Sequence, residues 1–577
     1  MGYKETYEQW LANPYFDAAT KAELEAIRDN EKEIEDRFYM SLAFGTAGLR
    51  GVIGAGTNRM NIYTVRKTTQ GLANYITKQG AQERGVAIAY DSRRMSPEFA
   101  DEAALCLCAN GIKAYVFESL RPTPELSFAV RTLKCIAGIN ITASHNPPEY
   151  NGYKVYWEDG AQITPPHDSG IMAEVQAVTD FAEVKTMDKE AAKAAGLYVP
   201  IGKEIDDAYI AALKSQVRRP DCIAEQAKNL RIVYSPLHGT GNIPARRIMK
   251  ELGFENVWVV PEQELPDGEF PTVSYPNPEA AEAFTLGLKL AKEVDADLVL
   301  ATDPDADRLG VYVKDAKSGE YITLTGNMSG CLLADYEIGQ IKELKGLPED
   351  GALIKTIVTS NLADAIARWY GVRLIEVLTG FKYIGQQILG FEESGKGTYL
   401  FGFEESYGCL IGTHARDKDA IVAVMALCEA AAYYKSKNMT LWDAMIAMYE
   451  RYGYYKDDIK TFTLKGKEGL EKIARIMDTL QKQAPATIGA YQVTSARDYM
   501  KDTVTDLATG EVKPTGLPSS KVLYYDLTDD AWVCVRPSGT EPKLKMYYGV
   551  KGASMEDAAE KSKALGQALE EIVEKID

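Results

Sequence analysis

Short apolar runs that alternate with longer helical patterns are the feature that most limits how this chain can fold. Residues 85–91, "GVAIAYD", precede the helical pattern "SPEFADEAALCLCANG", and residues 351–360 precede "NLADAIARWYG" in the same way. Further apolar runs lie at 113–118, in 230–241 and in 296–308. Strands that alternate with helices build largely parallel sheets covered by those helices. The sequence therefore predicts repeated α/β units.

The region from about residue 455 onward has a different pattern. One strand and one helix come first, then three strands separated by loops, and residues 554–575 form a closing amphipathic helix. This pattern predicts a smaller α+β domain. A chain of 577 residues allows about four domains. The candidate boundaries near 209, 323 and 453 divide it into 1–208, 209–322, 323–452 and 453–577.

The composition is that of a water-soluble globular chain, with 46% hydrophobic and 26% charged residues. A net charge of −18 argues against nucleic acid or an anionic membrane as the main partner, although local basic clusters can still bind a small anion. The N-terminus lacks the apolar core of a signal peptide, and no run approaches the ~18 apolar residues of a membrane helix. Eight scattered cysteines indicate buried free thiols in a reducing cytoplasm.

The stretch "TASHNPPEYNGYK", residues 142–154, follows an apolar strand expected at 135–142. Catalytic groups in α/β folds lie just beyond strand ends, and Ser144 is followed at once by His145. A serine hydroxyl is a weak nucleophile unless a neighbour activates it, and His145 is one candidate. The pattern is not GxSxG, so a hydrolase elbow is unsupported. These residues alone leave two interpretations open: a nucleophile loop or a simple turn.

The stretch "TDPDADR", residues 302–308, places three carboxylates at alternating positions after another apolar strand. In extended chain Asp303, Asp305 and Asp307 face one side, where they would repel strongly without a cation. Oxygen ligands suit Mg²⁺ or another hard divalent ion. Arg308 follows directly and can neutralise a carboxylate or hold an anion. The alternative is a solvated acidic turn.

The motif "GFEES" occurs twice, at 390–394 and at 402–406. The first copy follows a helical pattern and runs into an exposed turn, whereas the second follows the strand-like "TYLF". We therefore expect Glu404 and Ser406, rather than Glu392, Glu393 and Ser394, to form the rigid binding pair. A carboxylate beside a hydroxyl suits two neighbouring sugar hydroxyls. Nearby Arg416 and Lys418 could hold a phosphate or assist proton transfer, and the alternative is a pair of ordinary helix-start salt bridges.

The stretch "RPSGTEPKLK", residues 536–545, combines a Ser-Gly-Thr turn with Arg536, Lys543 and Lys545. Backbone N–H groups, hydroxyls and a guanidinium together form a typical anion cradle. The alternative is a hairpin turn with incidental charges.

These segments together resemble the α-D-phosphohexomutase family, in the expected order and over nearly the whole chain. "TASHNP" resembles its phosphoserine loop, "DPDADR" its metal loop, "GFEESYG" its sugar-binding loop and "RPSGTEPK" its phosphate-binding loop. "FGTAGLRG" at 44–51 resembles its N-terminal signature and adds Arg50 to the site. The acidic residue between Glu404 and Ser406 is similar to that of glucose-selective members. The chain looks closest to the long bacterial α-phosphoglucomutase type.

The resemblance implies four domains around a central cleft. Three would share a mixed α/β topology and carry, in order, the phosphoserine, metal and sugar loops. The fourth would be a smaller α+β domain, similar to the TATA-binding-protein fold, that binds phosphate.

The resemblance also implies an intramolecular phosphotransferase that interconverts α-D-glucose 1-phosphate and glucose 6-phosphate. Phosphate would be carried on Ser144, with one Mg²⁺ held by Asp303, Asp305, Asp307 and a phosphoseryl oxygen. Glucose 1,6-bisphosphate would be both intermediate and activator. His145, Lys154 and Lys418 match positions near the reacting hydroxyl, and which of them moves the proton stays open. Arg50 would stabilise the charge in transfer. The implied substrate contacts are Arg308, Thr379, Gly380, Glu404, Ser406, Arg416, Arg536, Ser538, Gly539, Thr540 and Lys545.

Two rival reactions remain at this stage. A phosphopentomutase or phosphomannomutase would use the same four segments to act on another sugar. A sugar-phosphate hydrolase would transfer the phosphate from Ser144 to water. The expected partners are small sugar phosphates, with no nucleic acid and no membrane, and the chain is expected to be a monomer or a weak homo-oligomer.

Overall fold

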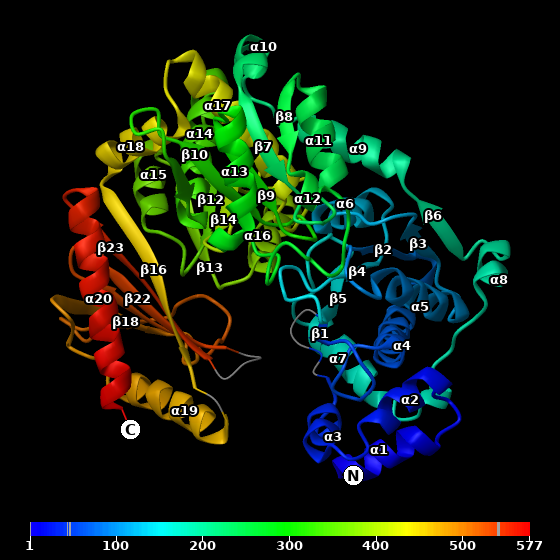
Figure 1. The fold of residues 1–577 in the computed structure, drawn as a ribbon. Coiled ribbons are helices and arrows are strands. Elements are labelled where there is room, and N and C mark those ends of the chain that lie inside the picture. The colour runs from blue at the N-terminus through cyan, green and yellow to red at the C-terminus, as the bar shows by residue number, and fades with distance from the viewer. Residues whose placement is uncertain (1, 43, 45–47, 465, 539–542, 577) are drawn as a thin grey trace. The chain divides into compact units, whose positions relative to one another are not determined.

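The computed structural model describes residues 2–42, 44, 48–464, 466–538 and 543–576, whose strands form four sheets (Figure 1). By internal contacts the chain divides into two compact units. The first unit comprises Met1–Thr325, Ile384–Lys396 and Ser406–Thr440. The second unit comprises Gly326–Tyr383, Gly397–Glu405 and Leu441–Asp577.

The first sheet is mixed. Its inner strand β2 pairs in parallel with β3 and β4, whereas β5 runs antiparallel to both β4 and β1. The strands, in sheet order, are β1 (Gly48–Val52), β5 (Tyr150–Trp157), β4 (Ala137–Ile141), β2 (Val86–Tyr90), β3 (Ala114–Phe117) and β6 (Tyr198–Ile201). All five residues of β4 are buried, which explains why all of them except Asn140 are apolar.

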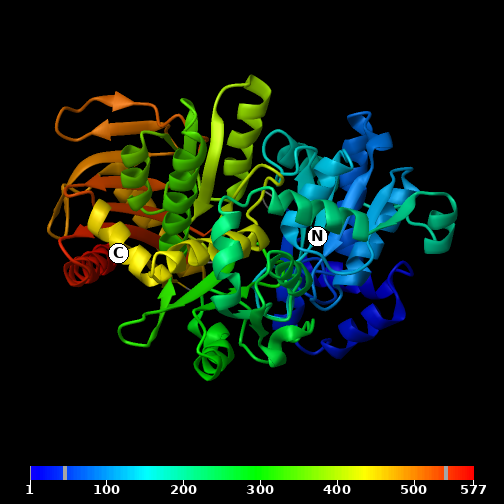
Figure 2. The ribbon, with the colours of Figure 1, turned by 90° about the horizontal axis from the view of Figure 1, so that it is seen from above.

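Helices cover both faces of this sheet (Figures 1 and 2). Successive side chains of β2 point to opposite faces, so Ile88 packs with Phe99 of α5, while Ala89 packs with Leu126 of α6. The helices around the sheet are α4 (Ile62–Lys78), α5 (Ser96–Ala109), α6 (Thr123–Thr132), α7 (His167–Ala177), α8 (Lys189–Ala194) and α9 (Lys203–Lys214). The alternation of strand and helix thus builds a helix–sheet–helix sandwich.

The second and third sheets repeat the order of the first. In each, an inner strand (β2, β7 or β12) lies between the next two strands of the chain. The strand after those two lies on the outer side of the second: β5 beside β4, β10 beside β9 and β15 beside β14. The second sheet contains β11 (Tyr321–Leu324), β10 (Leu309–Lys314), β9 (Leu298–Thr302), β7 (Arg231–Ser235) and β8 (Asn256–Val259). The third contains β13 (Arg373–Val377), β12 (Gly351–Thr356), β14 (Thr398–Glu404) and β15 (Gly408–Leu410).

The helices that accompany the second and third sheets lie before, between or after their strands along the chain. They are α10 (Pro220–Gln226), α11 (Asn242–Glu251), α12 (Pro261–Glu264), α13 (Thr285–Val294), α14 (Gly326–Lys345), α15 (Leu362–Tyr370), α16 (Phe381–Ser394), α17 (Ala420–Ser436) and α18 (Leu441–Tyr452). Helix α16 contains the first "GFEES" copy, whereas the second copy begins within β14 and continues into the loop after it.

The repeated order gives three equivalent loops, which directly follow the corresponding strands β4, β9 and β14. The loop after β4 carries Ser144, the loop after β9 carries the three aspartates, and the loop after β14 carries Ser406. Each loop holds one non-glycine residue at positive φ: Ser144 (53°), Ala306 (49°) and Tyr407 (64°). Such conformations are rare outside glycine and cluster at functional sites.

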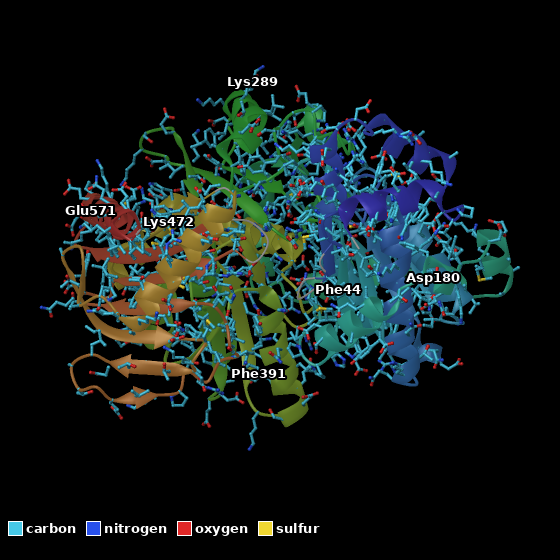
Figure 3. All side chains as sticks on the ribbon, turned by 90° about the horizontal axis from the view of Figure 1, so that it is seen from below. Phe44, Asp180, Lys289, Phe391, Lys472 and Glu571 are labelled. Atoms are coloured by element: carbon cyan, nitrogen blue, oxygen red, sulfur yellow. The ribbon has the colours of Figure 1, made fainter. Side chains whose placement is uncertain are left out.

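The C-terminal sheet is antiparallel in every pairing described, and it lies in the second unit. One face packs on α19 (Gly466–Lys482) and α20 (Met555–Lys575), with Ile476 and Leu569 buried there and Glu571 exposed (Figure 3). The strands are β16 (Tyr454–Thr463), β23 (Lys543–Gly552), β22 (Trp532–Pro537), β21 (Leu523–Leu527), β18 (Tyr491–Asp498), β19 (Thr503–Asp506), β20 (Val512–Lys513) and β17 (Thr487–Ile488).

The predicted fold class is confirmed: three mixed α/β sheets of shared order precede a smaller α+β part. The predicted boundary at 453 lies between α18 and β16, whereas those at 209 and 323 fall inside α9 and β11. The exact boundaries therefore stay predictions.

Three N-terminal helices were not predicted from the sequence: α1 (Tyr3–Ala12), α2 (Ala18–Ala26) and α3 (Glu31–Phe38). They enclose a small aromatic cluster in which Trp10 stacks on Phe16 at 4.1 Å.

Candidate active site

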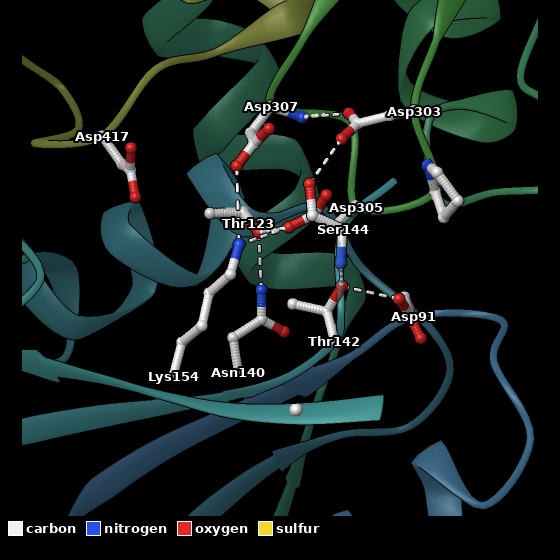
Figure 4. A network of polar contacts seen from close by, with 12 residues as sticks. Asp91, Thr123, Asn140, Thr142, Ser144, Lys154, Asp303, Asp305, Asp307 and Asp417 are labelled. Atoms are coloured by element: carbon white, nitrogen blue, oxygen red, sulfur yellow. Dashed lines mark hydrogen bonds and ion pairs between the residues drawn. The ribbon is translucent and has the colours of Figure 1, made fainter. Parts of the chain in front are cut away.

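Ser144 is buried, at 3% exposure, and its hydroxyl meets the acidic loop, which we define as residues 303–308. Its Oγ donates to Oδ2 of Asp303 at 2.8 Å (Figure 4). Nδ1 of His145 lies 3.1 Å from the same Oγ. Both segments belong to the first unit. The two strand-end loops that the sequence analysis singled out are thus in contact.

Asp303, Asp305 and Asp307 are buried at 0 to 1% exposure, and their carboxylates offer oxygens within 4.8 Å of one another. The backbone N–H groups of Asp307 and Arg308 donate to Oδ1 of Asp303, each at 3.1 Å. These bonds orient the Asp303 carboxylate toward Ser144. The turn that permits them places Ala306 at a φ of 49°.

The acidic loop has the donor set that a hard divalent cation requires. Oδ1 of Asp305 and Oδ1 of Asp307 are both buried and accept no hydrogen bond from any described residue. A buried carboxylate oxygen without a partner is costly unless a cation coordinates it. The three side chains therefore fit one Mg²⁺ or a similar ion.

Two lysines from different segments neutralise part of this charge. Nζ of Lys154, on β5, lies 2.8 Å from Oδ2 of Asp305 and 3.6 Å from Oδ2 of Asp307 (Figure 4). Nζ of Lys418 lies 3.0 Å from Oδ2 of Asp307. Both side chains are 11% exposed. The acidic loop thus lies between two ammonium groups and the Ser144 hydroxyl.

The environment separates the pKa values of the aspartates. Burial and the negative charges of Asp305 and Asp307 raise the pKa of Asp303 well above its usual value. Burial also acts to raise the pKa of Asp305, but Lys154 and the hydroxyl of Thr123 outweigh it and hold that pKa below its usual value. Burial, Arg308 and Arg50 lower the pKa of His145 well below its usual value, so its imidazole is neutral at pH 7.

Three of the four arginines predicted for the site have different surroundings within the first unit. Nη1 of Arg50 donates at 3.1 Å to Oδ1 of Asn146, in residues 144–150, which we call the serine loop. Nη1 of Arg308 donates to Oε1 of Glu279 at 2.6 Å. Arg416 is fully buried and ion-paired with Glu392 of the first "GFEES" copy. Its guanidinium also donates to the carbonyls of Thr413 and Ala415.

Other predicted contacts belong to the second unit: Thr379, Gly380, Glu404, Arg536, Ser538 and Lys545. Glu404 is the last residue of β14 and is buried at 6%, whereas Ser406 belongs to the first unit. The intervening Glu405 accepts a hydrogen bond from Thr356 at 3.0 Å, so its carboxylate helps to anchor the loop within the second unit. Gly539 and Thr540 lie outside the described residues.

Several polar residues that support these loops were missed by sequence reasoning. Oγ1 of Thr123 donates to Oδ2 of Asp305 at 2.7 Å, and the backbone N–H of Thr123 donates to the Asp305 carbonyl at 2.9 Å. Both the N–H and the hydroxyl of Thr240 donate to the carbonyl of Pro304, at 2.8 and 2.9 Å. Thr240 lies just beyond the end of β7, so the same strand-end rule could have found it.

The remaining chemistry-bearing groups do not form a second site of this kind. Among the described residues, the three aspartates are the only carboxylate, histidine or cysteine cluster with metal-binding geometry. The eight cysteines are free thiols, and seven of them are buried, as predicted. No described helix is both long enough and apolar enough to span a bilayer.

Family models match the chain in four consecutive segments. They are described as phosphoglucomutase/phosphomannomutase alpha/beta/alpha domain I (residues 41–181), domain II (207–319), domain III (325–452) and the C-terminal domain (501–562). The first three segments contain the three equivalent loops, one each.

Curated relatives and solved structures match over most of their length. A phosphoglucomutase of Staphylococcus aureus (strain MRSA252) is 36% identical over 540 residues, which is 93% of this chain and 95% of that protein. One of Staphylococcus epidermidis is 36% identical over 94% of this chain and 96% of its own length. The open form of parafusin, a phosphoglucomutase from Paramecium, superposes with a TM-score of 0.68 at 20% identity, covering 93% of this chain and 95% of that one. A Burkholderia thailandensis phosphoglucomutase/phosphomannomutase family protein gives 0.65 at 20% identity, covering 93% and 99%.

Proposed function

Because this chain belongs to the phosphoglucomutase/phosphomannomutase family, we propose that it is a phosphoglucomutase that interconverts α-D-glucose 1-phosphate and glucose 6-phosphate. Ser144 carries the phosphoryl group, and glucose 1,6-bisphosphate is the intermediate that also primes the enzyme. One observation carries this proposal above the others: the Ser144 hydroxyl donates at 2.8 Å to Asp303, within a cluster of three buried carboxylates.

The proposed transfer step conserves atoms and charge. A sugar hydroxyl oxygen forms a bond to phosphorus as the bond between phosphorus and Oγ of Ser144 breaks. The hydroxyl proton leaves to a base on the protein, and Oγ of Ser144 finally regains a proton. In the second half the bisphosphate returns its other phosphoryl group to Ser144 by the reverse sequence.

His145, Lys154 and Lys418 are the proposed proton-moving groups. His145 is neutral and its Nδ1 lies 3.1 Å from Oγ of Ser144, so it can accept a proton there. Lys154 and Lys418 bring two positive charges to the acidic loop and offset its negative charge as the phosphoryl group moves. Arg50 and Arg308 add positive charge beside the serine loop and the acidic loop.

Asp303, Asp305 and Asp307 would hold one Mg²⁺, together with an oxygen of the phosphorylated Ser144. When bound, the ion supplies positive charge that draws electron density from phosphorus and stabilises the leaving serine oxygen. The Oδ1 atoms of Asp305 and Asp307, which are buried and accept no hydrogen bond from the described residues, support this assignment.

Sugar-phosphate recognition is assigned to the remaining predicted residues. Glu404 and Ser406 pair with two sugar hydroxyls, Thr379 and Gly380 contact the ring, and the phosphate that does not react is bound at 536–545. The members of that segment are Arg536, Ser538, Gly539, Thr540 and Lys545. Arg416 supports the loop that carries Lys418, because its own guanidinium is buried and paired.

The test begins with the purified protein. Mass spectrometry should map one phosphate to Ser144, and Ser144→Ala should abolish turnover of glucose 1-phosphate in a coupled assay for glucose 6-phosphate. Ser394→Ala is the matched control, because Ser394 is an exposed serine at the end of α16. Full activity of Ser144→Ala would contradict the proposal.

A substrate panel separates the rival reactions. Glucose 1-phosphate should give a higher kcat/KM than ribose 1-phosphate or mannose 1-phosphate, and glucose 1,6-bisphosphate should activate the enzyme. Steady release of inorganic phosphate would instead indicate a hydrolase. The buried free thiols support action in a reducing compartment such as the cytoplasm. The proposal requires no partner chain, and a monomer or weak homo-oligomer is expected.

A further inference from the structure

Arg93 is a buried guanidinium that the proposed reaction does not use. It lies in the loop between β2 and α5, and the residue is 1% exposed. Nη2 donates to the carbonyls of Ser144 and Asn146, both at 2.5 Å. Nη1 donates to the carbonyls of Pro147 at 2.8 Å and Tyr150 at 3.0 Å. One side chain thus binds four carbonyls of the serine loop, residues 144–150.

The guanidinium is itself held from two sides. Its Nε lies 3.3 Å from Oδ2 of Asp91, and both side chains are fully buried. The ring of Phe270 lies 5.0 Å from Cζ of Arg93. A planar group with donors on both terminal nitrogens can bind several carbonyls at fixed angles, which a lysine ammonium cannot. The arrangement is therefore specific for arginine.

A second connection links Arg93 to Ser144 through hydrogen bonds. Oδ2 of Asp91 accepts from Oγ1 of Thr142 at 2.6 Å, and Oγ1 of Thr142 accepts from the backbone N–H of Ser144 at 2.8 Å (Figure 4). The Ser144 carbonyl points to Arg93, and its N–H points to Thr142. Both polar groups of the Ser144 backbone are thereby fixed.

This double fixation accounts for the backbone of Ser144. Its φ of 53° lies in the left-handed region, which a serine adopts only where the surroundings over-determine it. With the backbone held there, Oγ points at Asp303. We infer that Arg93, with Asp91 and Thr142, is a positioning residue that aims the Ser144 oxygen at the acidic loop for phosphoryl transfer.

The inference rests on the proposed function, but it can be tested separately from it. Arg93 should govern the rate at which Ser144 exchanges phosphate, but not the affinity for sugar phosphate, because the residues assigned to sugar and phosphate binding lie elsewhere. A residue with a merely structural role would alter both quantities together, through the fraction of folded protein.

The main experiment compares Arg93→Lys and Arg93→Met with the parent protein. The rate of phosphate transfer from glucose 1,6-bisphosphate to Ser144 is measured in a single turnover, and the Kd of glucose 6-phosphate is measured on the dephosphorylated protein. We expect the transfer rate to fall about 10- to 100-fold while the Kd changes less than about twofold. Hydrogen exchange of the peptide that covers 142–150 should accelerate.

Arg94→Lys is the matched control, because Arg94 is the adjacent arginine, is exposed, and pairs with Glu269 instead. A further arm adds guanidinium ion, at a non-denaturing concentration, to Arg93→Ala and should restore part of the transfer rate. A folded Arg93→Lys with the parent's transfer rate and exchange would overturn the inference. So would a Kd that weakens as much as the rate falls.

Thr142→Val keeps the proposal testable if the Arg93 variants do not fold. It removes the hydroxyl between Asp91 and the Ser144 N–H, and it should also slow transfer without changing the Kd, with Thr142→Ser restoring the rate. A parent protein that takes no phosphate would refute the proposed function. The exchange measurement on residues 142–150 would then still decide whether Arg93 holds the loop.

Discussion

The ammonium nitrogen of Lys154 lies 2.8 Å from Oδ2 of Asp305, so a cation of the first sheet is fixed against the acidic loop of the second. The pair joins residues 151 positions apart in the sequence. It links β5, whose side chains are almost all buried, to three carboxylates that would otherwise repel one another.

Replacing this cation should lower turnover without weakening the binding of Mg²⁺. Lys154→Met should lower kcat by about 100-fold or more, because a proton-moving or charge-balancing group is lost. The Mg²⁺ concentration for half-maximal activity should stay constant or fall, because the acidic loop becomes more negative. A Mg²⁺ titration of the coupled assay measures both, with exposed Lys317→Met as control. A Mg²⁺ requirement that rises with the loss of kcat would contradict this account.

Divalent cation should stabilise the first unit through the acidic loop. A saturating ion relieves the repulsion among the three buried carboxylates, and an ion at 100 times its Kd adds about 2.7 kcal/mol to the free energy of unfolding. We expect Mg²⁺ to raise the Tm of the parent protein after treatment with EDTA, but not that of Asp307→Asn. Differential scanning calorimetry provides the measurement, and Asp315→Asn, in an exposed turn, is the control. If Mg²⁺ raised the Tm of Asp307→Asn as much as that of Asp315→Asn, the ion would bind outside the acidic loop.

Gly239 should be intolerant of any side chain. A Cβ at this position would lie 2.5 Å from Cα of Pro304, so Gly239→Ala must displace the acidic loop. We expect the free energy of unfolding to fall by about 1–3 kcal/mol and the affinity for Mg²⁺ to weaken.

Gly390→Ala is the control for Gly239→Ala. Gly390 lies in α16 with open space around its Cβ, so alanine should stabilise the chain by about 0.5–1 kcal/mol. Chemical denaturation and metal titration measure both variants. If Gly239→Ala changed neither the free energy of unfolding nor the affinity for Mg²⁺, the acidic loop would not depend on its contact with Gly239.

Asp457 should make the stability of the second unit depend on pH. Burial raises its pKa to about 6, despite the favourable contacts with Ser360 and Lys355. Between about pH 4 and pH 6 the folded state therefore binds more protons than the unfolded state, and the contribution of Asp457 falls as pH rises. The loss is complete only above about pH 7, where it reaches about 2–3 kcal/mol.

The variant Asp457→Asn isolates this contribution from that of other carboxylates. Relative to the parent protein it should gain stability from pH 4 to pH 7, and the difference should be constant above pH 7. Calorimetry at several pH values detects the gain, with the exposed neighbour Asp458→Asn as control. A stability difference that does not vary with pH would show that Asp457 ionises normally.

The candidate site segments could be predicted from the sequence because each lies where an apolar strand ends. Ser144 and Asp303 were found in this way, and the choice of Glu404 over Glu392 also relied on a strand end. The same pattern predicted the three α/β sheets, since alternation of strand and helix is a local signal.

The supporting contacts could not be predicted, because they join side chains to backbone carbonyls far along the chain. Arg93 lies 51 positions before Ser144, and nothing local in "DSRR" reveals that its guanidinium faces four carbonyls. Strands β19 and β20 were missed for another reason: they are short and mostly polar, so they show no apolar period.

The three equivalent loops have a consequence for how such a chain can change. Each loop is anchored at the same point of a repeated sheet, yet the three differ in their chemistry, since one carries Ser144, one gathers three aspartates, and one combines two glutamates with Ser406. Because the anchors belong to separate sheets, mutations can retune one loop while the other two keep their backbone. Duplication of one unit would thus have supplied a modular scaffold, on which selectivity can diverge without rebuilding the chemistry.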